Sequence, residues 1–193
     1  WRQQDLKGMV AYSSISHMGV VLLGIATLNV TGLTGAVVQM VAHGLTAAAL
    51  FMLVGLLYQR THTRDLAAYG SLVERAPRFA FFLAFALLAA LGLPGSAGFI
   101  AELHALVGGF QRWGGWLLAC SLAVLIGAAY SLRVIGRLCL KTGTAMELAD
   151  MSRTESAGAT ALALGIVGLG LWPQPLLDMV STGVSQIALL FGG

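Results

Sequence analysis

The sequence predicts an all-α integral membrane protein with about five transmembrane helices, the fourth of them discontinuous. First, 58% of the residues are hydrophobic and 10% are charged, whereas a soluble domain is about 25% charged. Second, the mean hydropathy is +0.84. Third, a long apolar stretch over residues 79–111 is interrupted by LGLPGSAGF, which predicts the discontinuity.

The apolar runs place the individual spans. A helix of about 20 apolar residues crosses a bilayer, and four runs have that length: 9–28, 34–58, 115–138 and 157–177. The stretch 79–111 is too long for one straight helix, so it is either one crossing broken near 94–98 or two short crossings. Residues 178–193 form a C-terminal tail, which either ends the last span or lies as a short helix at the interface. The whole chain, 1–193, is thus a single transmembrane domain.

The distribution of positive charge selects one interrupted crossing, because Lys and Arg gather on the cytoplasmic side. With the N-terminal end inside, one interrupted crossing over 79–111 places two later groups of basic residues on the same side, the group at 60–78 and the group at 133–141. Two short crossings would place the last group outside. We therefore expect cytoplasmic loops at 59–77 and 140–156 and a C-terminus outside. The basic residues used here are Arg2, Lys7, Arg60, Arg64, Arg75, Arg78, Arg133, Arg137 and Lys141.

Charge and cysteine usage exclude several other functions. The net charge is +3, but the basic residues are scattered singly and do not form the basic face of a nucleic-acid-binding protein. Cys120 and Cys139 lack CxxC spacing and paired histidines, and no nucleotide-binding loop is present. We therefore expect no cofactor and no metal site. The chain opens on Trp1, so we also expect it to be part of a longer protein.

Ionisable residues inside the apolar runs are the candidate functional residues. Glu102 follows the break in the fourth span, His43 lies near the middle of the second, and His17 lies in the first half of the first. A charged group at the bilayer centre costs at least about 2.5 kcal/mol, and such groups usually line a pathway. Imidazole accepts a proton on one nitrogen and donates from the other. Together with a carboxyl group and a helix broken at Pro94, these residues predict a proton relay.

Each candidate also has a structural explanation. A histidine in a membrane helix can simply bond a serine or a carbonyl of its neighbour, and Pro94 can be a mere kink. His104 is better explained as a structural or interfacial residue. Lys7 either biases the relay electrostatically or anchors its helix at the membrane surface. A solvated loop, or a contact with a neighbouring subunit, accounts for His62, Arg64 and Asp65.

Five stretches of the chain resemble the antiporter-like subunits of respiratory complex I, in the family's order and at its spacing. They are DLKGMVAYSSISHMG, GAVVQMVAHGLTAAALFMLVGLLYQRTHTRD, YGSL, GLPGSAGFIAE and LWPQPLLD. The similarity is to the subunit M type of NADH:quinone oxidoreductase, which is related to mitochondrial subunit 4. It implies an antiporter-like fold of fourteen helices, with two inverted five-helix repeats. This chain would be the C-terminal half, helices ten to fourteen, and 79–111 would be discontinuous helix twelve.

The resemblance also implies a role for the candidates. In the family, protons cross through half-channels joined by buried charged and histidine residues. The family's SHMG histidine falls on His17, its AHG histidine on His43 and its helix-twelve acid on Glu102. Sister subunits usually carry lysine at that last position, which favours the M type. Ala101 and Leu103 depart from the family's common glycine and aromatic residue beside this glutamate.

This resemblance, together with the buried ionisable residues, implies a proton-translocating membrane-arm subunit of a bacterial complex I, with Glu102, His43, His17 and Lys7 as its relay. We expect a multi-pass protein of the inner (cytoplasmic) membrane, with other membrane-arm subunits and lipid as partners and no nucleic acid. The chain itself would carry no redox chemistry, and without the family's first half it would hold only the exit side of the pathway. Two alternatives are a sodium/proton antiporter or membrane-bound hydrogenase subunit of the same fold, and a purely structural spacer.

Overall fold

A bundle of helices makes up the computed structural model, which describes residues 3–69, 71–140 and 148–191, apart from the side chains of Ala67 and of several residues within 118–140. The chain opens with α1 (Leu6–Ala26) and the long helix α2 (Val30–Thr61). Side-chain caps begin both helices. Asp5 accepts a hydrogen bond from the amide of Gly8 at 2.7 Å, and Asn29 accepts one from the amide of Gly32 at 2.8 Å. These caps satisfy amides that have no partner within the helix.

The predicted break in 79–111 is present, as two helices separated by an irregular segment, and in chain order this span is the third of the five predicted spans rather than the fourth. A short helical turn, Leu66–Ala68, and α3 (Leu72–Arg75) lead into α4 (Pro77–Ala90). The chain then leaves the helical conformation over 91–96 and resumes it in α5 (Ala97–Trp113). Two glycines in the break have positive φ, +75° at Gly92 and +94° at Gly95, a conformation that side chains disfavour.

The remaining helices complete the bundle. A short turn, Gly114–Leu117, leads into α6 (Leu118–Ile135), which ends in a π-helical turn, Gly136–Leu140. A capping box of Ser152 and Glu155 begins α7 (Arg153–Leu171). The helix ends just before Pro173, which has no amide hydrogen to continue it, and α8 (Gln174–Leu190) follows. Of the two cysteines, Cys139 is buried and free, and the side chain of Cys120 lies outside the described part of the structure. The basic residues Arg2 and Lys141 also lie outside the described residues.

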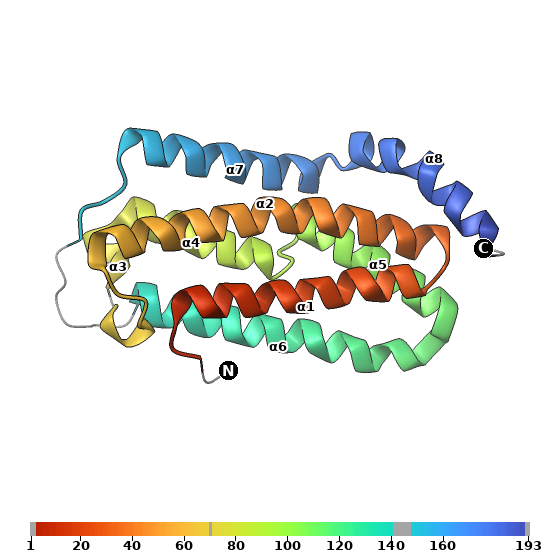
Figure 1. Cartoon of the computed structure of the whole chain (residues 1–193), viewed down its shortest axis with the longest axis horizontal. Coiled ribbons are helices and arrows are strands. Elements are labelled where there is room, and N and C mark those ends of the chain that lie inside the picture. Colours follow the sequence, from red (N-terminus) through yellow and green to blue (C-terminus); the bar gives the residue numbers. More distant parts are fainter. Residues whose placement is uncertain (1–2, 70, 141–147, 192–193) are drawn as a thin grey trace.

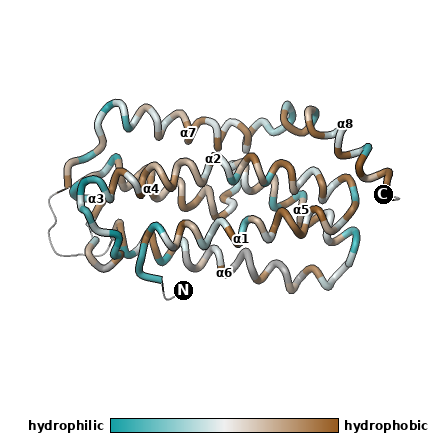
Figure 2. Tube along the Cα trace, viewed as in Figure 1, coloured by the Kyte–Doolittle hydropathy of each residue, from teal (hydrophilic) through white to brown (hydrophobic). Residues whose placement is uncertain are grey.

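Helix α2 is the centre of the bundle and contacts α1, α4, α5, α7 and α8. Figure 1 shows α7 and α8 running along one side of α2 and α6 along the other side of the molecule. The turn after α2, α3 and the start of α7 lie at one end of the bundle, and the C-terminus lies at the other. In Figure 2 the hydrophilic segments gather at the ends of the helices, with apolar segments between them.

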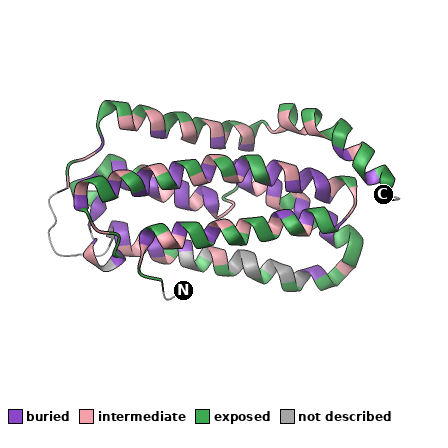
Figure 3. Ribbon diagram, in the orientation of Figure 1, coloured by how far each residue is buried: buried purple, intermediate pink, exposed green. Residues whose placement is uncertain are grey.

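Three helices of the described part, α1, α2 and α7, are long and apolar enough to cross a membrane, and α4 is a shorter apolar helix. The predicted all-α membrane fold is confirmed. Figure 3 shows buried residues on α2 and α4 and exposed ones along the outer faces of α1, α7 and α8. Those faces carry large apolar side chains such as Tyr12, Ile15, Leu22 and Met179. Such surfaces suit lipid or a neighbouring subunit.

Helix ends differ in places from the expected span ends. Helix α7 stops at Leu171, before the predicted end at residue 177, and most of the predicted tail forms α8. Val184 and Ala188 of α8 are buried together with Leu33 of α2, so this helix packs on the bundle. Helix ends do not locate the bilayer, and the five spans and their sidedness stay predictions.

Candidate functional site

Polar side chains from three helices meet in the middle of the bundle. His17 comes from α1, Gln39 and His43 come from α2, and Glu102 comes from α5. The Nδ1 atom of His17 lies 3.7 Å from Oε1 of Glu102 and 3.3 Å from Nε2 of Gln39. The rings of His17 and His43 lie 5.1 Å apart between centroids, with their planes tilted by 35°. We call these four residues the midplane cluster.

Local helix geometry accounts for part of this arrangement. Gln39 and His43 lie four residues apart on α2 and therefore share one face of that helix. The tight turn after α1 folds it back along α2, where the capping residue Asn29 also donates from Nδ2 to the carbonyl oxygen of Gly108 on α5 at 2.8 Å. One short segment thus joins all three helices that carry the cluster.

Close packing of α2 against α5 sets the position of Glu102. A methyl group at Gly35 would collide with the backbone nitrogen of Ala105, and one at Gly108 would collide with the backbone of Gly32. The two helices therefore touch backbone to backbone, as small residues allow in membrane proteins. We call this contact the glycine seam. It holds Ala101 and Ala105 fully buried and turns Glu102, on a neighbouring face, toward α1.

The break between α4 and α5 also faces Glu102. A Cβ atom at Gly92 would lie 2.6 Å from Oε2 of Glu102, so the carboxyl group rests against the glycine that the break requires. Breaking the helix frees backbone groups of 91–96 from regular helical bonding, and in membrane proteins such segments line protein-enclosed or watery spaces. The side chain hydroxyl of Ser96 is buried and has no hydrogen-bond partner among the described residues.

A cavity of about 490 Å³ lies beside the cluster. It is bounded by α1, the end of α4, α5 and α6. Most of the side chains that line it are apolar, but His17 and Glu102 also line it. Ser16 of α1 and Ser131 of α6 add hydroxyl groups to the lining. The space has room for water, which needs polar partners, and the lining provides them.

Burial makes charge costly within the cluster. The side chains of His17 and Glu102 are only 13% and 12% exposed. Oε1 of Gln39 and Nδ1 of His43 are buried and have no hydrogen-bond partner in the described structure. An isolated charge in such a place is unfavourable, and so is a polar atom without a partner, whereas transfer of a proton from a charged imidazole ring to a carboxylate neutralises both groups. Chemically, the arrangement is suited to moving protons between a carboxyl group and imidazole nitrogens.

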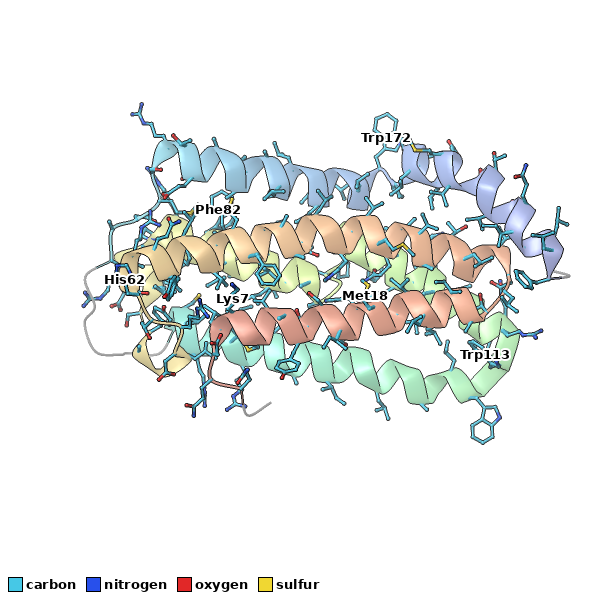
Figure 4. The ribbon with its side chains drawn as sticks, viewed as in Figure 1. Lys7, Met18, His62, Phe82, Trp113 and Trp172 are labelled. Carbon is cyan, nitrogen blue, oxygen red and sulfur yellow. The ribbon has the colours of Figure 1, made fainter. Side chains whose placement is uncertain are left out.

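Lys7 is not part of the midplane cluster. It is exposed at the first turn of α1, about 15 Å before His17 along the helix axis. Figure 4 shows Lys7 at the start of α1 and Met18, the neighbour of His17, in the middle of it. The Nδ1 atom of His104 lies 2.7 Å from the carbonyl oxygen of Ile100, one turn earlier on the same helix. Of the predicted relay, the structure thus brings together His17, His43 and Glu102.

Gln39 is the residue that the sequence analysis missed. A neutral amide is far cheaper in an apolar helix than a charge, so it does not stand out when charged residues are sought. The available signal was its spacing of four residues from His43, in VVQMVAHG. Only the contact with α1 shows that its amide reaches His17.

The described residues contain no group of three or more His, Cys, Asp or Glu side chains that could hold a metal ion. The prediction that no cofactor binds stays a prediction.

Comparison with known proteins places this geometry in a family. Residues 1–127 match the family model described as NADH:quinone oxidoreductase/Mrp antiporter, TM. The chain is 38% identical over 188 residues to NADH-quinone oxidoreductase subunit M of Rhodobacter capsulatus, covering 96% of this chain and 37% of that protein. It is also 38% identical over 189 residues to NADH-ubiquinone oxidoreductase chain 4 of Marchantia polymorpha, covering 96% of this chain and 38% of that one.

A solved structure shows the same arrangement of helices. A chain of respiratory complex I from Thermus thermophilus with bound NADH superposes with a TM-score of 0.93 and 31% identity, covering 99% of this chain and 41% of that chain. The predicted resemblance to the subunit M type and to part of the antiporter-like fold is confirmed. These two relatives come from a bacterium and a plant, and this chain spans well under half of their length. The chain belongs to the NADH:quinone oxidoreductase/Mrp antiporter transmembrane family.

Proposed function

We propose that this chain carries the exit side of the proton pathway in a subunit M of complex I. The observation that supports this most directly is the contact between His17 and Glu102, which joins α1 to the broken helix at the centre of the bundle. The similarity to subunit M and chain 4 supports the same assignment. Electron transfer from NADH to quinone would belong to other subunits, which would drive the relay through neighbouring antiporter-like subunits in the membrane arm.

In this mechanism His43 and His17 pass protons along the centre of the bundle. Glu102 is the terminal carrier, which accepts a proton from His17 and releases it to the outer side of the membrane. The cavity beside His17 and Glu102 gives water access to this step. Lys7 biases the relay electrostatically from the cytoplasmic edge. Each charge moved against 100 mV costs about 2.3 kcal/mol, which the redox reaction must supply.

We place the protein in the inner membrane of a bacterium. The bacterial relatives of the subunit M type support this location, although plant relatives of the chain 4 type match equally well. The cytoplasmic side would be the end of the bundle that holds α3 and the start of α7, because the basic residues Arg60, Arg64, Arg75 and Arg78 lie at that end or lead into it.

The geometry favours protons over sodium ions. Hard cations bind several oxygen ligands. The side chain in contact with Glu102 presents a ring nitrogen, His17 Nδ1, rather than an oxygen. A sodium/proton antiporter of the same fold therefore fits these residues less well, and proton uptake that persists when sodium is replaced by choline would agree with this.

The deciding experiment uses membrane vesicles that contain the full-length subunit assembled in its complex. Glu102→Gln keeps the shape of the side chain and one acceptor oxygen but cannot carry a proton. We expect proton pumping to fall by about 100-fold or more at equal assembly. His104→Gln is the matched control, because it removes another ionisable group of α5 that lies outside the cluster. Pumping by Glu102→Gln at the level of wild type would show that this carboxyl group is structural and would overturn the proposal.

A further inference from the structure

The amide of Gln39 is buried at the heart of the cluster and is only 2% exposed. Its Nε2 lies 3.3 Å from Nδ1 of His17, the same nitrogen that faces Oε1 of Glu102 at 3.7 Å. Two side chains from different helices therefore lie close to the same ring nitrogen. Whatever occupies that nitrogen decides whether His17 and Glu102 can exchange a proton.

The hydrogen-bond chemistry of the amide fixes the state of the ring. An amide nitrogen only donates, so Nδ1 of His17 accepts and carries no hydrogen when Gln39 has this orientation. The neutral ring then holds its hydrogen on Nε2. In this state the lone pair of Nδ1 is already engaged by Gln39 and is not free to take a proton from Glu102.

The other end of the same amide is unsatisfied. Oε1 of Gln39 is buried and has no hydrogen-bond partner in the described structure. The oxygen and nitrogen of an amide have nearly the same size, so a half-turn of the group fits the same space. After that half-turn, Oε1 would face Nδ1 of His17 and could accept a hydrogen from it. The second orientation therefore suits a ring that carries a proton on Nδ1.

We propose that the Gln39 amide is a two-position latch on Nδ1 of His17, which holds the ring through its carbonyl before proton delivery to Glu102 and through its NH2 group afterwards. This inference rests on the proposed relay and assigns Gln39 as a positioning residue, because the amide itself carries no transferred proton. In this scheme the orientation in which Nε2 of Gln39 faces Nδ1 of His17 follows delivery. With its lone pair engaged, Nδ1 does not take the proton back.

Proton transfer from His17 to Glu102 breaks one bond and forms one. The ring begins with hydrogens on both nitrogens and a positive charge, while Glu102 is a carboxylate. The Nδ1–H bond breaks and leaves its electron pair on the ring, and an O–H bond forms on Oε1 of Glu102. The ring is left neutral with its hydrogen on Nε2, and the carboxyl group is neutral. Gln39 then turns and donates to the vacated lone pair.

The test compares pumping with and without an opposing membrane potential, in vesicles that contain the assembled complex. Gln39→Met keeps the length of the side chain but has neither donor nor acceptor. We expect its pumping against about 100 mV to fall roughly tenfold more than its pumping without opposing potential, because protons return to His17. Thr34→Val is the matched control, since it removes another buried polar group of α2 away from the cluster. Its pumping should match wild type in both conditions.

A second variant separates the latch from simple space filling. Gln39→Glu, as a neutral acid, keeps one donor and one acceptor, so we expect it to restore much of the pumping against the potential. A residue that only fills space would give the opposite order, with Met tolerated and Glu harmful. That order, or a Gln39→Met variant that pumps like wild type against the potential, would overturn the latch.

Glu102→Gln measured in the same vesicles keeps the two proposals distinguishable. If Glu102→Gln still pumps, the relay itself is wrong and the latch is overturned with it. If Glu102→Gln stops pumping while Gln39→Met sustains wild-type pumping against the potential, the relay stands and only the latch is overturned.

Discussion

His17 and Glu102 meet across the centre of the bundle, with 3.7 Å between Nδ1 and Oε1, and they belong to helices α1 and α5, each of which packs more extensively on α2 than on the other. This distance is somewhat long for a direct hydrogen bond and short enough for one to form with a small movement of either side chain. The contact is therefore suited to intermittent exchange of a proton rather than to a permanent ion pair.

Replacing His17 tests the carrier on the α1 side of that contact. His17→Gln keeps a side chain that can hydrogen-bond but removes the ability to bind and release a proton. We expect pumping by the assembled complex to fall by about 100-fold. His62→Gln provides the control, because His62 is an exposed histidine at the end of α2. Equal pumping by the two variants would contradict a carrier role for His17.

Gly92 links the break in the helix to the carboxyl group of Glu102. We expect Gly92→Ala to destabilise the protein by about 1–2 kcal/mol because of its positive φ, and also to push Oε2 of Glu102 out of place. Gly95→Ala has a similar backbone problem, but its Cβ would meet only Leu171, at 3.8 Å. Thermal unfolding should therefore shift similarly in both variants, while the pumping rate should fall much further in Gly92→Ala.

Asp150 caps a helix from a distant part of the chain. Helix α4 begins after Ala76, which cannot cap it, and Asp150 accepts hydrogen bonds from the amides of Arg78 at 3.2 Å and Phe79 at 3.1 Å. We expect Asp150→Ala to cost about 1 kcal/mol and to speed amide hydrogen exchange at the start of α4. Asp150→Asn keeps an acceptor oxygen and should show a smaller effect. Unchanged exchange in Asp150→Ala would argue against the cap.

The hydroxyl group of Tyr69 stabilises the turn that follows α2. It bonds to Thr61 Oγ1 at 2.8 Å and donates to the carbonyl oxygen of Thr63. Burial raises the pKa of the phenol above its usual value of about 10. The folded state holds this proton more tightly than the unfolded state. The protonated hydroxyl of Tyr69 therefore contributes its full stabilisation below about pH 10, and this contribution is lost as the pH rises through the folded pKa.

We therefore expect Tyr69→Phe to lower the free energy of unfolding by about 1 kcal/mol at neutral pH. The difference between wild type and variant should shrink as the pH rises above about 10, in unfolding experiments on the purified complex. A difference that grew with pH in this range would contradict the assignment.

The sequence was sufficient for the fold class and for three members of the cluster. His17, His43 and Glu102 stand out because ionisable residues are rare in apolar runs, and LGLPGSAGF marks the break because Pro and Gly interrupt helices. Gln39 and Asp150 could not be identified in the same way. Each gains its role from a partner far away in the chain, and neither residue type is unusual in its own segment. The charge of Lys7 places it in the predicted relay, but ten residues of α1, or about 15 Å along the helix axis, separate it from His17.

The glycine seam has a consequence for how sensitive the relay is to distant change. Where two backbones touch, no side chain can adopt another rotamer to absorb a displacement, so a larger residue at Gly35 or Gly108 acts as a wedge. The wedge would swing α5 outward as a rigid lever and open the gap between His17 and Glu102. Gly35 and Gly108 never hold a proton, yet they would set the conductance of the pathway, because each carries only a hydrogen atom where any other residue carries a side chain.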